Sequence, residues 1–386
     1  NSGTWNNKLR LILNNGIITN NNLIVNDDSI TISVTGKLTN KHTLTNNKTI
    51  TNNGNLVNYL GKTITNNKTL VNNLILDNAG IINNSHTNGI INNNSTFNNK
   101  SSAVTTNYGV INLNTGGTIT NKGTLNNTKT SNSILATFNI VGTLANTDSG
   151  TIVNTSIIDN KANGTITNLG IVNNTGDVNI LASSIFTNSK NYNNLLSGTI
   201  YGSLNVSGTT TNQHTISNNG RINIKSTGIF NNNLTFTNDS LLIVLGTMKN
   251  FKAATLTNND ILKNYKILLN YGTVINNKTF STFDSSTLNN YNVFNNISTG
   301  TLNTRSIFIN KKTNATNSDS VDLTNIEGVF TNFGSFTHAK STLTNLGLVT
   351  NTGTITNTDS IIITAEGRVL NQNIITNDSL ITNGGT

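Results

Sequence analysis

Acidic residues are the first candidates for chemistry in this sequence. Cleavage of a polysaccharide by general acid–base catalysis needs two carboxyl groups close together. The chain has 15 Asp and Glu residues among 386, and Asp27–Asp28 is the one place where two are adjacent. The others are scattered singly through a sequence rich in Asn and Thr. We therefore expect no catalytic residue and predict that the protein is not an enzyme.

One short motif supplies the argument for a polysaccharide-degrading enzyme. Asn146–Thr147–Asp148 and Asn357–Thr358–Asp359 resemble a motif of polygalacturonase-like hydrolases, a group of β-helical enzymes. The companion motifs, an Asp pair in a Gly-rich turn and a Gly-His-Gly, are missing. Because Asn-Thr-Asp arises readily in an Asn/Thr-rich chain, we keep this enzyme only as the less favoured alternative.

Metal and cofactor sites lack candidate residues as well. The sequence has no cysteine, and its histidines stand alone, without a second ligand at the spacing that zinc sites use. No phosphate-binding loop and no nucleophile elbow occurs. We predict no metal and no cofactor, and we interpret the histidines as exposed corner residues: His42, His86, His214 and His338.

The charge pattern does not favour a nucleic-acid or membrane partner. The formal net charge is +9, but the lysines occur singly, without an Arg cluster or interleaved aromatic residues, so we expect no nucleic acid. The longest apolar run, Leu241–Leu245, has the length of a strand, so we expect no membrane span in this chain. Because the chain starts Asn-Ser-Gly-Thr-Trp, we expect a processed product or a fragment.

The dominant feature of the sequence is a repeat with a period of six residues. Residues 36–59 read GKLTNK, HTLTNN, KTITNN and GNLVNY, with an aliphatic third residue and Asn at the fifth position. The unit recurs along the chain, for example as GTITNK, HTISNN and STLTNL. Proline, which would remove a backbone donor, is absent throughout.

Each hexad predicts one short strand and one corner. Thr-Ile-Thr alternates polar and apolar residues as a half-buried strand does, so its central residue points inward. The Asn two residues later points inward again, at a corner that its backbone preferences suit. We predict an inward core of Leu38, Leu44, Ile50, Leu56, Ile64 and Leu70. The predicted inward corner residues, whose amides stack into ladders, are Asn40, Asn46, Asn52 and Asn58.

Strands this short favour a chain that winds in one direction over a series of hairpins. We predict an all-β fold, a single parallel β-solenoid with about 18–20 residues per coil, in which residues 1–386 form one continuous repeat domain. Residues 1–15 depart from the repeat and are the candidate N-terminal capping segment. The repeat weakens at residues 127–142, 177–198 and 315–334, where we expect loops or bulges.

The alternation of Gly, an aliphatic residue and Asn is clearest in GTITNKGTLNN, residues 117–127. It resembles the β-helical repeats of filamentous haemagglutinin-type exoproteins and autotransporter passengers. Similar Asn-rich repeats occur in surface proteins of giant viruses. The resemblance covers nearly the whole chain and implies a right-handed β-helix displayed at a cell or virion surface. A left-handed hexapeptide helix fits less well, because His42 and Lys48 stand where that fold needs a small residue.

These observations favour a structural or adhesive subunit of an extracellular surface fibre. The repeat continues to Thr386, so we expect a homo-oligomer, with subunits stacked head to tail into a filament. Host-surface or extracellular glycans are the other expected partners. Ice binding and polysaccharide binding are alternative functions. Ice binding needs Thr-x-Thr pairs on one face, whereas the pairs at residues 43–45 and 49–51 lie in consecutive hexads, on different sides of a coil.

Overall fold

A four-residue strand followed by a two-residue corner is the building unit of this protein in the computed structural model. Thr49–Asn52 shows the usual pattern, in which the second and fourth residues are buried and the first and third are half-buried. The pattern follows from the alternation of side chains along a strand. The structure describes residues 3–85, 88–130, 134–189, 191–194, 198–296, 301–304, 307–310, 315–317, 324–326, 329–332, 335–338, 343–358 and 360–386.

The chain divides into two compact units, unit 1 (Asn1–Gly198) and unit 2 (Thr199–Thr386). Each unit is a parallel β-solenoid with three sheets, here called A, B and C, and the described residues form no helix. In each unit a strand pairs in parallel with the strands three before and three after it along the chain, so one coil contributes one strand to every sheet. The all-β parallel solenoid predicted from the sequence is confirmed. Its expected right-handed sense and its single continuous domain stay predictions.

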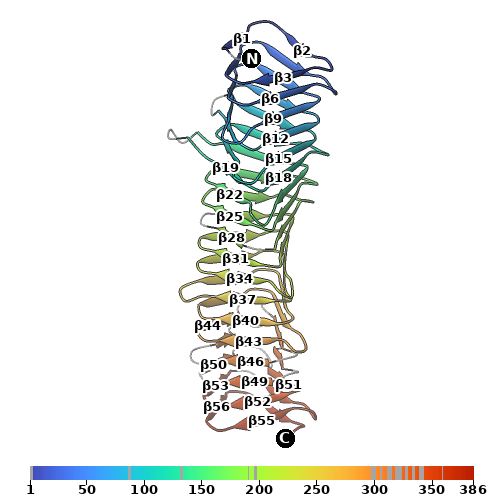
Figure 1. The fold of residues 1–386 in the computed structure, drawn as a ribbon. Helices are drawn as coiled ribbons and strands as arrows, with labels where there is room; N and C mark the ends of the chain where they lie inside the picture. Colours follow the sequence, from blue (N-terminus) through green and yellow to red (C-terminus); the bar gives the residue numbers. More distant parts are fainter. Residues whose placement is uncertain are drawn as a thin grey trace. The chain divides into compact units, whose positions relative to one another are not determined.

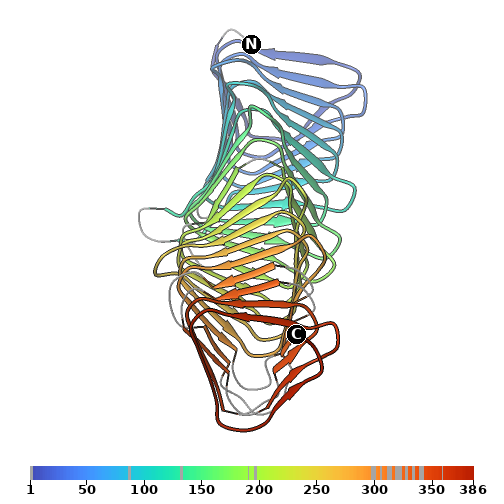
Figure 2. The ribbon, with the colours of Figure 1, turned by 90° about the horizontal axis from the view of Figure 1, so that it is seen from below.

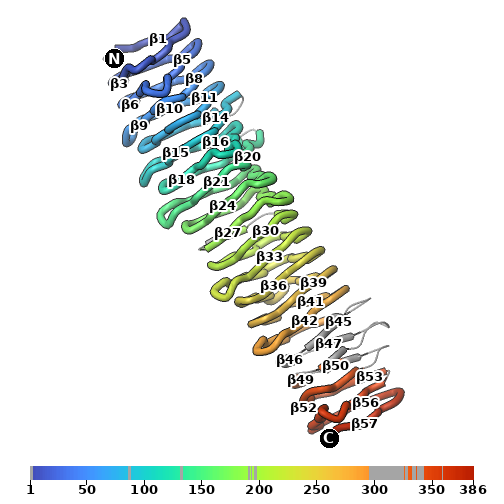
Figure 3. The backbone as a smooth tube through the Cα atoms, turned by 90° about the vertical axis from the view of Figure 1, so that its right-hand side faces the viewer, coloured from blue at the N-terminus to red at the C-terminus, as the bar shows by residue number. Residues whose placement is uncertain are grey.

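In unit 1 the strands of one sheet lie one above the next, as β3, β6, β9 and β12 do in Figure 1. Figure 3 shows the coils of this unit running parallel, from blue to green. Sheet A holds β1 (Trp5–Asn7), β4 (Leu23–Asn26), β7 (Thr43–Asn46), β10 (Thr63–Asn66), β13 (Ile81–Asn84), β16 (Val104–Asn107), β19 (Thr124–Asn127), β22 (Thr151–Asn154), β25 (Ile171–Asn174) and β28 (Asn191–Asn194). Sheet B holds β2 (Leu11–Leu13), β5 (Ser29–Ile32), β8 (Thr49–Asn52), β11 (Thr69–Asn72), β14 (Ile90–Asn93), β17 (Val110–Leu113), β20 (Thr137–Ile140), β23 (Ile157–Asn160) and β26 (Asp177–Ile180). Sheet C holds β3 (Ile17–Asn20), β6 (Lys37–Asn40), β9 (Asn55–Asn58), β12 (Ile75–Asn78), β15 (Thr96–Asn99), β18 (Thr118–Asn121), β21 (Thr143–Asn146), β24 (Thr165–Asn168) and β27 (Ile185–Asn188).

Unit 2 repeats this arrangement, and β29 (Gly198–Ile200) falls at the division between the units. Sheet A holds β31 (Thr209–Asn212), β34 (Ile229–Asn232), β37 (Thr247–Asn250), β40 (Ile267–Asn270), β43 (Thr287–Asn290), β46 (Ile307–Asn310), β49 (Val329–Asn332), β52 (Leu348–Asn351) and β55 (Arg368–Asn371). Sheet B holds β32 (Thr215–Asn218), β35 (Thr235–Asn238), β38 (Thr255–Asn258), β41 (Thr273–Asn276), β44 (Val293–Asn296), β47 (Ala315–Asn317), β50 (Ser335–His338), β53 (Thr354–Asn357) and β56 (Ile374–Asn377). Sheet C holds β30 (Ser203–Val206), β33 (Arg221–Ile224), β36 (Leu241–Val244), β39 (Ile261–Asn264), β42 (Thr279–Thr282), β45 (Thr301–Thr304), β48 (Thr324–Ile326), β51 (Leu343–Asn345), β54 (Ile361–Ile363) and β57 (Ile381–Asn383).

Corner length sets the number of residues in a coil. Three strands with three two-residue corners give the 18-residue offset between the paired residues Thr255 and Thr273. Replacing one of those corners by a four-residue corner gives the 20-residue offset between Leu23 and Thr43. The third residue of a four-residue corner often has left-handed backbone, as at Asn163 (φ 68°). The predicted range of about 18–20 residues therefore reflects two corner types.

Aliphatic and aromatic side chains from the three sheets fill the interior of each coil. Figure 2 shows the backbone that winds around this interior. Aromatic rings from neighbouring sheets meet there, for example Phe230 of sheet A and Phe236 of sheet B, with ring centroids 5.3 Å apart. Burial of such side chains drives folding, at roughly 1.5–3 kcal/mol for each large one. The rings keep the tilted or edge-to-face geometry that aromatic pairs prefer.

Two of the three irregular stretches can be followed in the structure. β19 ends at Asn127 and β20 begins at Thr137, and the described residues between them, 128–130 and 134–136, form no strand, as expected for a loop. Residues 177–198, in contrast, contain the regular strands β26, β27 and β28. Much of 315–334 lies outside the described residues. Residues 1–15, the candidate cap, contain β1 and β2, which pair with β4 and β5.

Candidate functional site

The most distinctive structural feature of the protein is a set of buried Asn ladders. In each ladder the side-chain Nδ2 of one Asn donates to Oδ1 of the Asn one coil further along. In unit 1 the sheet A ladder is unbroken, with N···O distances of 2.7–2.9 Å. It runs through Asn7, Asn26, Asn46, Asn66, Asn84, Asn107, Asn127, Asn154, Asn174 and Asn194. The sheet C ladder in unit 1 runs through Asn20, Asn40, Asn58, Asn78, Asn99, Asn121, Asn146, Asn168 and Asn188, at 2.7–2.9 Å.

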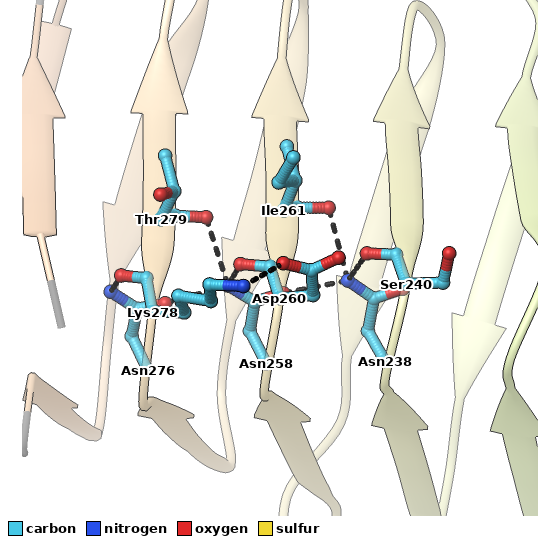
Figure 4. A network of polar contacts seen from close by, with 8 residues as sticks. All are labelled: Asn238, Ser240, Asn258, Asp260, Ile261, Asn276, Lys278 and Thr279. Carbon is cyan, nitrogen blue, oxygen red and sulfur yellow. Dashed lines mark hydrogen bonds and ion pairs between the residues drawn. The ribbon is translucent and has the colours of Figure 1, made fainter. Parts of the chain in front are cut away.

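Many ladder amides also close their own corner, as Figure 4 shows for sheet B of unit 2. Asn258 Nδ2 donates to Asn276 Oδ1 at 2.6 Å, to the Thr279 carbonyl at 2.9 Å and to the Asp260 carbonyl at 3.1 Å. Asn258 Oδ1 accepts from Asn238 Nδ2 at 2.6 Å. The amide thus binds its own corner and the next coil together. A buried amide is costly unless its donors and acceptors are paired, and these are.

The ten residues singled out in the sequence all lie inside unit 1. Consecutive hexads supply different columns, because each hexad contributes to the next sheet. The aliphatic set has 0–1% of its surface exposed: Leu38 and Leu56 in sheet C, Leu44 and Ile64 in sheet A, Ile50 and Leu70 in sheet B. The corner set is fully buried: Asn40 and Asn58 in sheet C, Asn46 in sheet A and Asn52 in sheet B. Asn40 and Asn58 are ladder neighbours, 2.8 Å apart.

The corner that follows sheet B in unit 1 departs from this rule. Asn52, Asn72 and Asn93 form a short ladder there, but other coils place aliphatic residues at the same position: Leu13, Ile32, Leu113, Ile140 and Ile180. Asn160 pairs in register with Ile140 and Ile180, so it has no amide neighbour in this column. Its Oδ1 is buried without a hydrogen-bond partner. The six-residue repeat did not predict this mixed column. Its signal in the sequence was an aliphatic residue in place of Asn at the fifth position of some hexads.

The acidic pair considered for catalysis takes part in contacts between coils. Asn47 Nδ2 donates to Asp27 at 2.7 Å, and Lys48 Nζ lies 3.1 Å from Asp28. Two more ion pairs of this kind join Lys100 to Asp77 and Lys278 to Asp260. These carboxylates are solvent-exposed in part and paired with lysines or amides of the next coil, so they form surface contacts between coils that each contribute little to stability.

The short motif and the histidines do not converge on a site in the part of the chain that the structure covers. Asn146 of the Asn-Thr-Asp motif is a ladder residue, and Asp359 of the second copy lies outside the described residues. His42 lies at a corner and is exposed, as predicted, whereas His214 lies at a corner but is half-buried, and its Nδ1 is buried without a hydrogen-bond partner. The side chains of His86 and His338 are not described. Among described residues there is no group of three His, Cys, Asp or Glu arranged to hold a metal ion.

Sheet B of unit 2 carries a Thr array that the hexad pattern did not reveal. Thr215, Thr235, Thr255 and Thr273 pair in register at the first strand position, and Ser217, Thr237 and Thr257 do so at the third. All are half-buried on the outer face of the sheet. In unit 1 the consecutive pairs at 43–45 and 49–51 lie on sheets A and B, on different faces as expected.

A second outer surface of unit 2 carries stacked aromatic rings. Phe251, Tyr271 and Tyr291 follow β37, β40 and β43 and occupy the same corner in successive coils. Tyr271 and Tyr291 stack with centroids 4.6 Å apart and ring planes at 13°, and Phe251 lies 6.4 Å from Tyr271. On the other border of sheet A, Tyr265 and Phe283 stack at 4.2 Å. We call sheet A from β34 to β43, with both bordering corners, the aromatic–lysine face.

The spacing of these three aromatic residues along the sequence is the signal from which their stacking could have been predicted. Residues 251, 271 and 291 lie 20 positions apart, which is the length of a coil with one four-residue corner. Recognition of the stack required the corner lengths, because a strict six-residue period does not bring these positions together. The aromatic residues were therefore missed as a site.

Comparisons with protein families and curated proteins do not assign this chain to a family. No protein-family model matches the sequence, and a search of curated proteins finds no match. Among the residues described, no helix is long and apolar enough to cross a membrane. The fold and the ladders define the class of the chain, which is that of an Asn/Thr-rich β-solenoid repeat protein.

Proposed function

We propose that the protein is a structural stalk subunit of an extracellular surface fibre that also presents adhesive faces. The observation that supports this most is the unbroken sheet A ladder of unit 1, in which every Asn bonds to its equivalent in the next coil. Such a ladder gives each coil the same polar contacts, so the unit is stabilised by neighbouring coils in series. A scaffold of this kind needs length and regularity.

The resemblance to surface β-helical repeats supports the same proposal. Filamentous haemagglutinin-type exoproteins, autotransporter passengers and giant-virus surface proteins share this style of repeat, and they carry solenoids outside the cell or on the virion. In this chain the ladders lie in the interior, while the outer faces differ from sheet to sheet. The interior thus provides the stalk, and the faces provide the contacts. Head-to-tail stacking of subunits stays a prediction.

Immunogold electron microscopy of the intact cell or virion tests this proposal. Antibodies raised against the folded chain should label the outer surface, along projecting fibres, before any permeabilisation. As a control, an antibody against an interior protein of the same cell or virion should give no label before permeabilisation. Label found only after permeabilisation would overturn the proposal.

The Thr array on sheet B of unit 2 favours ice binding as a second candidate function. Flat, regularly spaced hydroxyl and methyl groups are what an ice-binding surface requires, and this array spans four strands. We expect inhibition of ice recrystallisation that is lost in Thr237→Lys/Thr257→Lys. The control Thr45→Lys/Thr65→Lys changes an equivalent pair on sheet A of unit 1. Equal activity of the two double variants, or none in the parent protein, would rule this candidate out.

A further inference from the structure

Charge is distributed unevenly around unit 2. Between residues 225 and 292 the aromatic–lysine face carries four lysines and one acidic residue, Asp284. Asp239 and Asp260 lie at a different corner, between sheets B and C, where Lys278 neutralises Asp260 at 2.6 Å. The lysines of the face are Lys225, Lys249, Lys252 and Lys266. Positive charge therefore remains in excess on this face.

A hollow of about 360 Å³ lies within this face. Phe251, Leu269 and Tyr271 line it with apolar surface, and Lys249 and Lys252 are its charged residues. Phe251 is 38% exposed, which is high for a large aromatic side chain in this protein. The volume falls in the range of ordinary ligand pockets, which are roughly 300–1,000 Å³ and combine apolar walls with a few polar groups.

We propose that this hollow binds an acidic glycan, through one uronate-like residue of a longer chain. Lys249 and Lys252 would pair with the carboxylate, because no acidic residue lines the hollow to compete for them. The C–H groups of a sugar ring would pack against Phe251 and Leu269. Sugar hydroxyls would meet the Tyr271 hydroxyl, which can donate and accept. This inference rests on the proposed adhesive stalk and names the partner of one of its faces.

The stacking geometry favours a glycan over single-stranded nucleic acid, which also combines anionic charge with flat rings. The bases of single-stranded nucleic acid bind to proteins by stacking on the open faces of aromatic side chains. Here Tyr271 and Tyr291 lie nearly parallel and 4.6 Å apart, so each covers a face of the other. One face of each of these two rings is therefore closed to a stacking base. Two lysines in the hollow also fall short of the phosphate contacts that nucleic-acid binding uses.

Calorimetric titration with defined oligosaccharides tests the proposal on the full chain. The probes are an oligogalacturonate, a neutral dextran fragment of similar length and an oligo-deoxythymidylate. We expect binding of the oligogalacturonate that weakens with added salt, because charge contacts at a surface are screened. Binding of dextran at equal strength, or preference for the oligonucleotide, would overturn the assignment to an acidic glycan.

Variants locate the site. Lys249→Ala/Lys252→Ala should weaken oligogalacturonate binding about five- to tenfold, as expected for the loss of two exposed charge contacts. The control Lys122→Ala/Lys161→Ala removes the same charge from corners of unit 1 and should leave affinity within about twofold. Phe251→Ala should weaken binding without changing its salt dependence. An equal effect of the two lysine pairs would show that binding follows net charge and would overturn the site.

Circular dichroism of every variant separates loss of binding from loss of folding. The glycan result is also independent of the stalk proposal. Surface fibres labelled by antibody, together with no glycan binding, would refute this inference and leave the stalk intact. Glycan binding by a protein that is found only inside the cell would support this inference and refute the stalk proposal.

Discussion

At the scale of single residues, the ladder amides explain how so polar an interior is stable. Asn46 Nδ2 donates to Asn66 Oδ1 at 2.7 Å and to the Thr69 carbonyl at 2.9 Å, and its Oδ1 accepts from Asn26. Each amide therefore replaces the water contacts it loses on burial. A buried Asn is stabilising only when neighbouring residues pair with its amide, because an isolated buried amide keeps the desolvation cost without a hydrogen-bond partner to offset it.

This dependence gives a paired prediction for two Asn residues of unit 1. Asn46→Leu leaves Asn66 Oδ1 without its donor and should lower the free energy of unfolding by about 1–3 kcal/mol. Asn160→Leu should stay within about 1 kcal/mol of the parent, because its Oδ1 is already unpaired, its column neighbours are aliphatic, and the substitution removes one hydrogen bond, from Nδ2 to the Ile185 carbonyl. Urea unfolding measures both. Equal losses would show that a ladder amide is worth no more than an isolated one.

Tyr192 predicts how stability responds to alkaline pH. Its side chain is buried beside Phe186, with ring centroids 5.1 Å apart, and burial raises the pKa of the Tyr192 phenol well above its ordinary value of 10. Below pH 10 both the folded and unfolded chains keep the proton. Above pH 10 the unfolded chain loses it first, so the contribution of Tyr192 to stability falls by about 1.4 kcal/mol per pH unit.

Tyr192→Phe should therefore lose less stability than the parent between pH 9 and pH 11. Unfolding in urea at a series of pH values measures the difference between the two proteins. Tyr59→Phe, which changes a tyrosine that is 47% exposed, is the matched control. A parent and Tyr192→Phe that follow the same pH curve would contradict the prediction.

At the scale of the element, corners follow a stacking rule. Wherever a two-residue corner stacks on a four-residue corner of the coil before, its second residue tends to be glycine. A Cβ there would collide with the carbonyl oxygens of the longer corner, as at Gly123 against Lys100 and Ala103. The same contact recurs at Gly54, Gly80, Gly142, Gly170, Gly246 and Gly272. These glycines are needed for close approach, and none has the positive φ that usually calls for glycine.

The rule predicts the effect of adding a Cβ. Gly123→Ala should cost about 2–3 kcal/mol, because it overpacks a corner whose neighbours are backbone atoms. Gly61→Ala, the control, meets open space and loses only what its left-handed backbone (φ 68°) costs, about 1 kcal/mol. Thermal or urea unfolding compares the two. A Gly123→Ala variant as stable as Gly61→Ala would disprove the steric origin of the rule.

Much of the element structure could be predicted from the sequence, because local alternation specifies it. Thr-Ile-Thr-Asn has one inward face, so strand register and the burial of Ile50 and Asn52 follow from the period of two. Corner length, in contrast, depends on contacts between coils. For that reason the length of the connection between β19 and β20 and the stacking of residues 251, 271 and 291 could not be predicted from the six-residue period. The candidate binding face was invisible to a six-residue period.

At the scale of the whole molecule, each unit gains its stability in series, coil upon coil. Nearly every hydrogen bond between strands joins a coil to its immediate neighbours, so no contact in a unit requires a particular total number of coils. Such a unit resembles a one-dimensional array, whose stability is a sum of repeats and interfaces. Removal of one complete coil should therefore be tolerated, provided that the neighbours on either side match.

Deletion of residues 43–62, combined with Leu74→Gly, tests this in unit 1. The deletion removes Gly54 and places the corner 73–74 on the four-residue corner 33–36, so Leu74→Gly restores the glycine that the stacking rule requires there. The deletion removes one strand from each sheet and joins His42 to Thr63, so that β4 meets β10 and β6 meets β12. Equivalent residues take over the lost contacts: Asn26 faces Asn66, Asn40 faces Asn78, and Lys68 replaces Lys48 opposite Asp28. We expect a folded protein with unchanged circular dichroism per residue and a slightly smaller denaturant dependence, because less surface is exposed on unfolding.

A shorter deletion should do more damage. Removing the single hexad 43–48 takes out six residues but moves every later strand of unit 1 to the neighbouring sheet. Because those strands move together, they keep their pairing with one another, and the mismatch falls on one junction. There the four-residue corner 59–62 comes to lie on the four-residue corner 33–36, in the place of the corner that contains Gly54. We expect the hexad deletion to unfold at lower urea than the 20-residue deletion. The reverse order would mean that a hexad, and not a coil, is the unit in which this protein is built.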